Sequence, residues 1–437
     1  MAAYRKMERN ELEMLREQLS RTYRLHQQNG AVLNMARGNP SKKQLDLSMG
    51  MLTILDEMTD FVSEGAVDCR NYGAVDGILE AKRLMAGLMQ TGPEQVLIHG
   101  NSSLAIMYDS IARSVTHGVM GNTPWNHLER VKFLCPVPGY DRHFAITAHF
   151  GIEMIPVPMQ ETGPDMDLIE RLVSEDEAIK GIWCVPQYSN PTGTVYSNET
   201  IQRFAGLKPK ADDFRIYWDN AYGVHHLYAG PENVLEILDA CAKVNNPDMV
   251  YKFASTSKIS FPGAGIAAIA ASAANLAQIK KQLQIQTIGY DKLNQLRHVK
   301  FFGNADGIRA HMKLHAKILR PKFEKVLAIL ESELGGLDIG EWTNPKGGYF
   351  ISFNSEAGCA KKILQKAKKA GLIMTEAGAT FPYGMDPEDK NIRIAPTYLE
   401  LEELTRATEL FCLCVKIVSI EKLLGISTIE CRKLTES

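Results

Sequence analysis

The chain has 437 residues, of which 45% are hydrophobic and 23% charged, a balance that is typical of a folded protein with a large core. Lysine and arginine together number 49 and the two acids 51, so the formal charge is 49 − 51 = −2, which argues against a nucleic-acid partner. The first 20 residues lack the apolar core of a secretory signal, and no stretch has the roughly 20 strongly apolar residues of a membrane helix. We therefore expect a cytoplasmic protein that does not insert into membranes.

The N-terminal part and the middle of the chain have different patterns. Residues 4–28 have helical spacing with Leu12, Leu15 and Leu19 on one stripe, which predicts a helix that docks on the rest of the protein. From about residue 75, helical patterns alternate with short apolar runs at 95–99, 131–135, 152–157, 181–185 and 215–218. Strands that alternate with helices favour an α/β fold with a mainly parallel sheet and helices on both faces.

The pattern changes again after a helical region at 273–335, which we interpret as a long helical hairpin. There follow a strand at 347–353, a helix near 356–370, a strand at 391–395 and a helix at 399–424. This order predicts a smaller α+β domain that the N-terminal segment completes. We divide the chain into an N-terminal segment of the small domain, a large domain, a C-terminal small domain and a tail, at 1–60, 61–305, 306–425 and 426–437.

Polar and aromatic side chains follow the predicted strands, where parallel sheets bind their ligands. The turns there read Gly100-Asn101-Ser102-Ser103, Pro138-Gly139-Tyr140, Asn190-Pro191-Thr192-Gly193 and Asp219-Asn220-Ala221-Tyr222. A further turn, Ser255-Thr256-Ser257-Lys258, places a lysine beside hydroxyl groups. An aldehyde cofactor with a ring and a phosphate needs a lysine, a carboxylate, a stacking ring and a helix N-terminus, and these turns offer all four.

These motifs resemble, in their order and spacing, those of the fold-type-I pyridoxal-phosphate aminotransferases over about residues 30–420. The resemblance extends to Arg37-Gly38-Asn39-Pro40, Asn71-Tyr72-Gly73 and Asn391-Ile392-Arg393. Gln295-Leu296-Arg297-His298 and the run after Lys258 are similar to a divergent bacterial aspartate aminotransferase subgroup, which is related to transcription regulators with an aminotransferase-like domain. The resemblance implies a three-layer α/β/α large domain with a mostly parallel sheet, a smaller α+β domain, and a homodimer with active sites at its interface.

The resemblance also implies a role for each matching residue toward pyridoxal 5'-phosphate. Lys258 would hold the cofactor as a Schiff base and move the substrate proton, and Asp219 would pair with the pyridine nitrogen. Asn190 and Tyr222 would bind the phenolic oxygen of the cofactor, and Tyr140 would stack on its ring. The implied phosphate contacts are Asn101, Ser102, Ser103, Ser255 and Ser257, with Tyr72 from a partner subunit.

For the substrate, the resemblance implies that Arg393 binds the α-carboxylate, with Gly38 and Asn190 beside it. The expected reaction is ping-pong transamination from L-aspartate to 2-oxoglutarate, which gives oxaloacetate and L-glutamate. A dicarboxylic substrate needs a second cation, and the candidates are Arg37 and Arg297. A β-lyase, a decarboxylase or an aminotransferase for another amino acid on the same fold stays open.

One departure from the family concerns the phosphate. Members commonly have an arginine a few residues after the lysine, but here Pro262-Gly263-Ala264-Gly265-Ile266 contains no arginine or lysine. The same stretch opens a GxGxxA match from Gly263 to Ala268, which is the fingerprint of nicotinamide-dependent oxidoreductases. That fingerprint needs an acidic residue about 20 positions on, whereas the first acid here is Asp291. We interpret these glycines as packing for a strand at 266–271.

Two further alternatives are disfavoured. A non-catalytic regulatory module that binds pyridoxal phosphate would have a DNA-binding domain ahead of it, but only 36 residues precede Arg37. A zinc site would need paired ligands, yet the eight cysteines have no CxxC spacing. His311 and His315 are four residues apart in a run rich in basic residues, so we expect a solvated helix face there. We expect reduced thiols and no metal, and we assign His225 and His226 no role.

Overall fold

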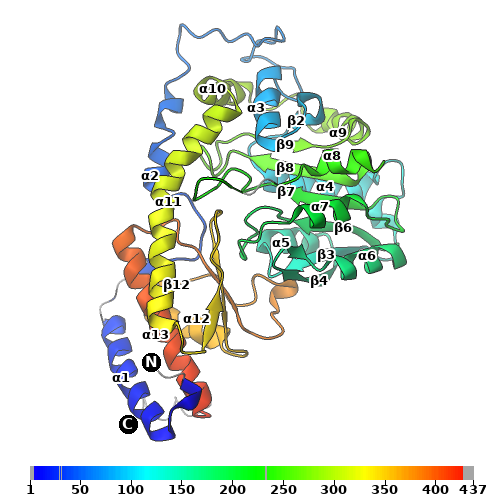
Figure 1. Ribbon diagram of the computed structural model, residues 1–437. Coiled ribbons are helices and arrows are strands. Elements are labelled where there is room, and N and C mark those ends of the chain that lie inside the picture. The colour runs from blue at the N-terminus through cyan, green and yellow to red at the C-terminus, as the bar shows by residue number, and fades with distance from the viewer. Residues whose placement is uncertain (1–3, 29, 31, 232–233, 427–437) are drawn as a thin grey trace.

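The computed structural model describes residues 4–28, 30, 32–231 and 234–426 (Figure 1). Its larger sheet has eight strands in the order β2-β9-β8-β7-β6-β3-β4-β5. The strands from β4 through β3, β6 and β7 to β8 are parallel to one another, whereas β9 and β5 pair antiparallel. The bounds are β2 Val96–Ile98, β3 Lys132–Val137, β4 Glu153–Gln160, β5 Gly163–Pro164, β6 Ile179–Cys184, β7 Arg215–Asp219, β8 Val250–Ser255 and β9 Ala267–Ala270.

Helices cover both faces of this sheet, because its central strands are buried on both sides. In β6 and β7, Ile182 and Ile216 belong to one core cluster, whereas their chain neighbours Trp183 and Tyr217 belong to another. Successive side chains of a strand point to opposite faces, so each cluster fills one face. The covering helices are α3 Leu79–Met89, α4 Ser103–His117, α5 Asp141–His149, α6 Met166–Glu175, α7 Asn198–Ala205, α8 Ile237–Lys243, α9 Ala273–Gln286 and α10 Lys292–Phe302. The predicted α/β/α architecture is confirmed.

A second, antiparallel sheet has the order β10-β11-β13 and lies beside a group of helices away from the large sheet (Figure 1). Helix α1 packs along α13, with Leu12 buried as predicted, and β1 pairs in parallel with β12. The N-terminal segment is therefore part of this smaller unit. Its elements are α1 Arg9–Gln28, β1 Leu33–Asn34, β10 Gly340–Trp342, β11 Ile351–Ser355, α12 Ala360–Lys369, β12 Leu372–Ile373, β13 Asn391–Ile394 and α13 Leu401–Leu423.

The predicted hairpin at 273–335 is wrong in detail, since three helices occupy it. Gly303 ends α10 with a left-handed backbone at φ 69°, and the Asn304 side chain then accepts the first amides of α11, Ala305–Leu334. Helix α11 runs alongside both sheets (Figure 1). The remaining elements are the short helix α2, Lys42–Asp46, and 3₁₀ turns at Tyr4–Lys6, Met49–Leu52, Pro93–Gln95, Trp125–His127, Pro247–Met249 and Pro382–Gly384.

Three other expectations concern the whole chain. None of the helices in the described residues is long and apolar enough to cross a membrane. The seven described cysteines are buried and free, while Cys431 and the predicted tail after Ile426 lie outside the described residues. The glycines of the GxGxxA match precede β9 instead of linking a strand to a helix, as a dinucleotide fingerprint would.

Candidate active site

Three chemically active side chains meet at the carboxyl ends of neighbouring strands. Asp219 is the last residue of β7, and Lys258 lies in the turn after β8, the strand that pairs with β7. Asn190 lies in the loop that follows β6 on the other side of β7. The parallel order of these strands therefore brings the predicted lysine, carboxylate and amide to one edge of the sheet, as expected.

The carboxylate of Asp219 is only 3% exposed and uses one of its oxygens. Oδ2 accepts a hydrogen bond from Nε2 of His143 at 3.1 Å, and the imidazole stacks on Trp183 with ring centres 4.5 Å apart. Oδ1 is buried and has no hydrogen-bond partner in the described part of the chain. Because a buried carboxylate oxygen without a donor is costly, Asp219 is prepared for a ligand that carries an N–H group.

Lys258 points toward the aromatic side chain of Tyr222, with its Nζ 5.0 Å from the ring centre. Burial lowers the pKa of this lysine from its usual value, and the nearby charge of Asp219 opposes part of that shift. Burial also raises the pKa of Tyr222 well above its usual value, so the phenol keeps its proton as a hydrogen-bond donor. A lysine with a lowered pKa is suited to nucleophilic attack and proton transfer.

Arg393 reaches Asn190 from β13 of the smaller sheet. Its Nη1 donates to Oδ1 of Asp141 at 2.9 Å and to Oδ1 of Asn190 at 3.3 Å, and its Nη2 donates to Oγ1 of Thr375 at 3.2 Å. The guanidinium also lies 4.8 Å from the centre of the Phe350 ring. Its Nε is buried without a partner among the described residues. A guanidinium held on one side and open at Nε can bind a carboxylate.

The N-terminal segment packs closely against the Phe350 ring at Gly38. A Cβ added to Gly38 would lie 2.4 Å from the Phe350 ring, so no other residue allows the segment to approach so closely. Arg37 follows the same path but is exposed. Gly38 therefore packs on the ring that also contacts Arg393, with Arg37 next to it in the chain.

The predicted phosphate residues also come together. Asn101 donates from Nδ2 to the carbonyl of Gly263 at 2.7 Å, and Ser257 donates to the carbonyl of Asn101 at 3.4 Å. Ser255 donates to Oγ of Ser257 at 3.1 Å. Ser102 precedes Ser103, the first residue of α4, but does not cap the helix with its side chain. Among the described residues no side chain caps the first amides of α4, and uncapped amides at a helix N-terminus are suited to binding a phosphate.

Comparisons with known proteins agree with this geometry. Residues 7–427 match the family model described as aspartate amino-transferase. The chain is 44% identical over 390 residues to an aspartate aminotransferase of Corynebacterium glutamicum, a match that covers 89% of this chain and 90% of that protein. The chain belongs to the aspartate amino-transferase family.

Solved structures of aminotransferases have the same fold. The crystal structure of an aspartate transaminase from Corynebacterium glutamicum matches with a TM-score of 0.93 and 41% identity, covering 96% of this chain and 99% of that one. An α-aminoadipate aminotransferase from Thermus thermophilus, complexed with N-(5'-phosphopyridoxyl)-L-leucine, matches with a TM-score of 0.72 and 20% identity over 89% of this chain and 93% of that one. The chain is an aminotransferase, and the oxidoreductase alternative is excluded.

Tyr72 of this aminotransferase lies away from the cluster. Tyr72 is 80% exposed in a surface loop, where the Gly73 carbonyl accepts a hydrogen bond from Lys292 at 3.1 Å. Arg297 lies on α10, behind the turn that carries Lys258.

Tyr140 precedes α5 and contacts the His143 ring edge-on at 5.0 Å between ring centres. Burial and the charge of Asp219 raise the pKa of Tyr140 to about 12.

Sequence reasoning was wrong about His311 and His315. Both are buried, at 7% and 1% exposure, because α11 packs beneath the turn after Lys258 and against α2. Their Nε2 atoms are 3.1 Å apart, Nε2 of His311 lies 3.0 Å from the Ile259 carbonyl, and Nδ1 of His315 lies 3.1 Å from Nε2 of Gln44. Spacing along a helix does not tell which face is covered.

Sequence reasoning also missed His143, Asp141 and Phe350. His143 and Asp141 lie within three residues of Tyr140 on the first turn of α5. Only their titratable side chains beside a predicted site residue could have indicated a role in the site. Phe350 lies in the loop before β11, where Gly347 and Gly348 pass against Tyr188 so closely that a Cβ would lie 2.3 Å and 2.8 Å from it. These contacts join distant parts of the chain and have no local pattern.

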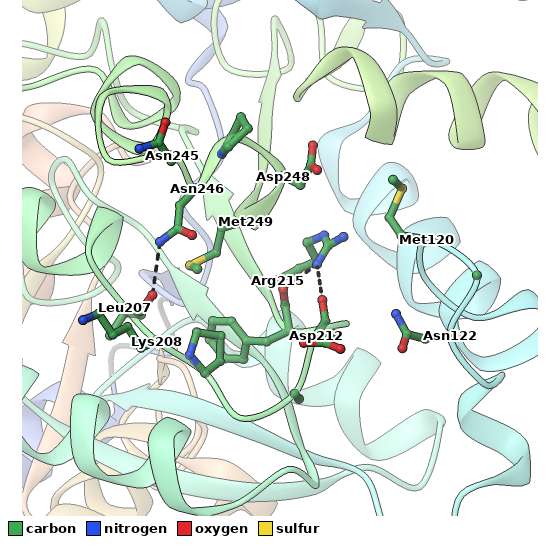
Figure 2. Close-up of a pocket in the computed structure, with 15 residues that line it drawn as sticks. Met120, Asn122, Leu207, Lys208, Asp212, Arg215, Asn245, Asn246, Asp248 and Met249 are labelled. Atoms are coloured by element: carbon green, nitrogen blue, oxygen red, sulfur yellow. Dashed lines mark hydrogen bonds between the residues drawn. The ribbon is translucent and has the colours of Figure 1, made fainter.

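A surface pocket of about 680 Å³ lies at the opposite end of the large sheet (Figure 2). It is lined by residues that precede β7 and β8, among them Lys208, Asp212 and Asp248. Arg215 lines it too, but its Nη1 donates to the carbonyls of Asp212 and Phe214. Because Lys258 and Asp219 lie at the other ends of these strands, the pocket is separate from the active site.

Proposed function

We propose that this aminotransferase moves the amino group of L-aspartate to 2-oxoglutarate, with pyridoxal 5'-phosphate as its cofactor. The observation that carries the proposal is that Lys258, Asp219 and Arg393 come together around Tyr222 and Asn190, with an open carboxylate oxygen on Asp219 and an open Nε on Arg393. The phosphopyridoxyl group in one solved structure of this fold and the aspartate specificity named for two similar proteins support it.

The residues present fit the cofactor. The open Oδ1 of Asp219 suits a protonated ring nitrogen, and the hydroxyls and open amides around Ser102 and Ser257 suit a phosphate. Asn190 and Tyr222 offer donors for the phenolic oxygen, and Tyr140 offers a ring to stack on. When bound, the cofactor supplies an aldehyde that takes up the amino group and a cationic ring that accepts electrons.

The side chains of the chain itself then bind, orient and move protons. Lys258 would hold the cofactor until the substrate amine takes its place. Its freed amine, whose pKa burial lowers, would then take the proton from the substrate Cα and pass it on. Asp219 keeps the ring nitrogen protonated by charge and hydrogen bonding. His143 fixes Asp219 in the orientation that leaves Oδ1 open.

Arg393 binds the α-carboxylate of the substrate through its open Nε and Nη2 edge, while Asn190 and Gly38 shape the space around it. For the distal carboxylate we favour Arg37 over Arg297. Arg37 is exposed and neighbours Gly38, which packs on the Phe350 ring that also contacts Arg393, and this proximity is the reason for the choice. A second guanidinium there would select dicarboxylic substrates.

We also propose a homodimer in which Tyr72 reaches the cofactor phosphate of the partner subunit. Tyr72 is exposed, and the neighbouring segment before α10 exposes apolar side chains, with Ile288 at 63% and Ile285 at 90%. Large apolar side chains gathered on a surface indicate a protein interface. The loop of Tyr72 is tied to this segment by the bond from Lys292 to Gly73.

The experiment that tests the function is an absorbance spectrum of the purified protein with single amino acids and no acceptor. We expect a yellow band of bound pyridoxal phosphate, conversion to the pyridoxamine form by aspartate, and recovery of the band with 2-oxoglutarate. A colourless protein that pyridoxal phosphate does not reconstitute would overturn the cofactor. A yellow protein that ignores aspartate but responds to another amino acid would overturn the substrate.

Product analysis separates transamination from other reactions of the fold. We expect oxaloacetate and glutamate in equal amounts, formed only when 2-oxoglutarate is present. Pyruvate and ammonia from a cysteine-like substrate, or carbon dioxide from aspartate, without need for an acceptor, would indicate a lyase or a decarboxylase. The matched control is Lys258→Ala, which should fold normally but lose turnover entirely.

A further inference from the structure

The stretch after Lys258 has no cation for the cofactor phosphate, yet a phosphate that is partly buried needs positive charge nearby. Residues 262–266 supply only backbone groups, and Ser255, Ser257 and Asn101 are neutral. Helix α4 adds the partial charge of its N-terminus, which is equivalent to about half an elementary charge. The following inference rests on the proposed cofactor and concerns where the missing cation comes from.

Arg297 is a guanidinium without an anion. It is half-buried on α10, donates from Nη2 to Oδ1 of Asn294, and pairs with no carboxylate in the described part of the chain. Its Nε is buried and has no acceptor among the described residues. A half-buried charge with an unused donor costs free energy unless an anion completes it. Arg297 is thus built to meet an anion that is not part of its own chain.

The position of Arg297 indicates which anion this is. Asn294, which accepts from Arg297 through Oδ1, donates through Nδ2 to the carbonyl of Gly265 at 2.8 Å. One turn further along α10, Nε2 of His298 lies 3.1 Å from Oγ1 of Thr256 and 2.8 Å from Oγ of Ser260. Helix α10 therefore packs directly on the turn that carries Lys258 and on the glycine stretch behind it.

The glycine stretch joins Arg297 to the phosphate residues. Its Gly265 end is held by Asn294, and its Gly263 end accepts the 2.7 Å hydrogen bond from Asn101. Asn101 in turn accepts from Ser257, beside the open amides of α4. A Cβ at Gly265 would lie 2.8 Å from Oγ1 of Thr256, so the stretch lies close against the turn of Lys258 at this residue.

We propose that Arg297 is the cation that binds the phosphate of the cofactor in this chain. Helix α10 holds the glycine stretch through Asn294, and Arg297, three residues further along the helix, would supply the guanidinium that residues 262–266 lack. A guanidinium binds phosphate through two parallel N–H donors, which suits an arginine with Nε and Nη2 on one edge. The single bond to Asn294 orients the side chain and leaves Nε for the ligand.

The test measures how the full chain, stripped of cofactor, distinguishes pyridoxal phosphate from pyridoxal. We compare wild type, Arg297→Gln and Arg297→Lys by titrating intrinsic fluorescence with each compound, and by the shift in melting temperature with inorganic phosphate. We expect Arg297→Gln to lower the affinity for pyridoxal phosphate about 10- to 100-fold, since the charged contact is lost. The affinity for pyridoxal should stay within about 2-fold of wild type. Arg297→Lys should recover part of the affinity, and the stabilisation by phosphate should fall in Arg297→Gln.

The matched control is Arg309→Gln, the same substitution at an exposed arginine of α11 that pairs with Asp306 at 2.6 Å. It should leave both affinities unchanged. Equal weakening of pyridoxal phosphate and pyridoxal by Arg297→Gln would overturn the inference in favour of a structural role. An unchanged pyridoxal phosphate affinity with a raised KM for aspartate but not for alanine would assign Arg297 to the distal carboxylate. Failure of wild type to bind pyridoxal phosphate at all would instead overturn the proposed cofactor.

Discussion

His143 and Asp219 form a buried pair in which Nε2 of the imidazole donates to Oδ2 of the carboxylate at 3.1 Å, while Oδ1 stays open. The imidazole is itself held by stacking on Trp183, whose indole Nε1 donates to Thr147 at 2.8 Å. The orientation of the carboxylate is therefore fixed before any ligand binds, which is the preorganisation that catalytic electrostatics requires.

We predict that Asp219→Ala lowers kcat by about 10²- to 10³-fold and weakens cofactor retention, because a charge-assisted partner is lost from a buried site. Steady-state kinetics and the amount of cofactor kept through dialysis measure the two effects. His143→Ala should cost about 10-fold, since the carboxylate remains but loses its orientation. Equal losses in the two variants would mean that His143 does more than orient Asp219.

A second prediction concerns Arg393 and its neighbour Asp141. Arg393→Lys should raise KM for aspartate and 2-oxoglutarate about 10- to 100-fold with a smaller change in kcat, because an ammonium cannot reproduce the planar set of donors. Initial-rate kinetics with both substrates measure this. Normal kinetics in this variant would move the α-carboxylate site elsewhere.

Two variants of Asp141 distinguish the effect of its charge from its role in positioning Arg393. Its Oδ1 accepts from Arg393 at 2.9 Å, so Asp141→Ala should free the guanidinium and raise KM several-fold. Asp141→Asn keeps an oxygen that can accept this bond, and its KM should stay within about 3-fold of wild type. If Asp141→Asn instead binds substrate much more tightly than wild type, the carboxylate competes with the substrate and does not position Arg393.

The sequence predicted the parts of this protein that follow from local pattern. Strand ends placed Asn190, Asp219 and Lys258 together because a parallel sheet aligns its carboxyl ends, and short apolar runs located those strands. The pairing of Asp219 with His143 and the supports of Arg393 could not be predicted, since they depend on side-chain directions and contacts between distant segments. The domain boundaries and the residue roles remain predictions from the resemblance.

Gly38 provides a third prediction about the N-terminal segment. A methyl group on Gly38 would lie 2.4 Å from the Phe350 ring, so the segment or the ring must move. Forcing extra volume into such a contact costs about 1–3 kcal/mol. Gly38→Ala should therefore raise KM for aspartate about 5- to 100-fold, and the double variant Gly38→Ala, Phe350→Leu should recover part of the loss. An unaltered KM in Gly38→Ala would mean that the position of the N-terminal segment does not affect substrate binding.

The buried histidines predict how stability depends on pH. Burial, with a smaller contribution from His311, lowers the pKa of His315 to about 3, whereas the usual value of an exposed histidine is about 6.5. Below pH 6.5 the unfolded chain therefore binds a proton at this residue, whereas the folded protein does not. The contribution of His315 to the free energy of unfolding is fully present above pH 6.5 and is lost as the pH falls toward 3. At pH 5 the loss is about 2 kcal/mol for this one residue.

Urea unfolding at pH 7.5 and pH 5, at fixed protein and cofactor concentrations, measures this decline. His315→Gln replaces the ring with an amide that does not titrate, so the difference between the two pH values should shrink by up to about 2 kcal/mol relative to wild type. His117→Gln, at an exposed position, should leave the difference unchanged. Because the bonds of His315 to Gln44 and His311 are also altered, the variant is less stable at both pH values, and only the change in pH dependence tests the claim. A difference equal to that of wild type would show that His315 is not the residue that resists protonation.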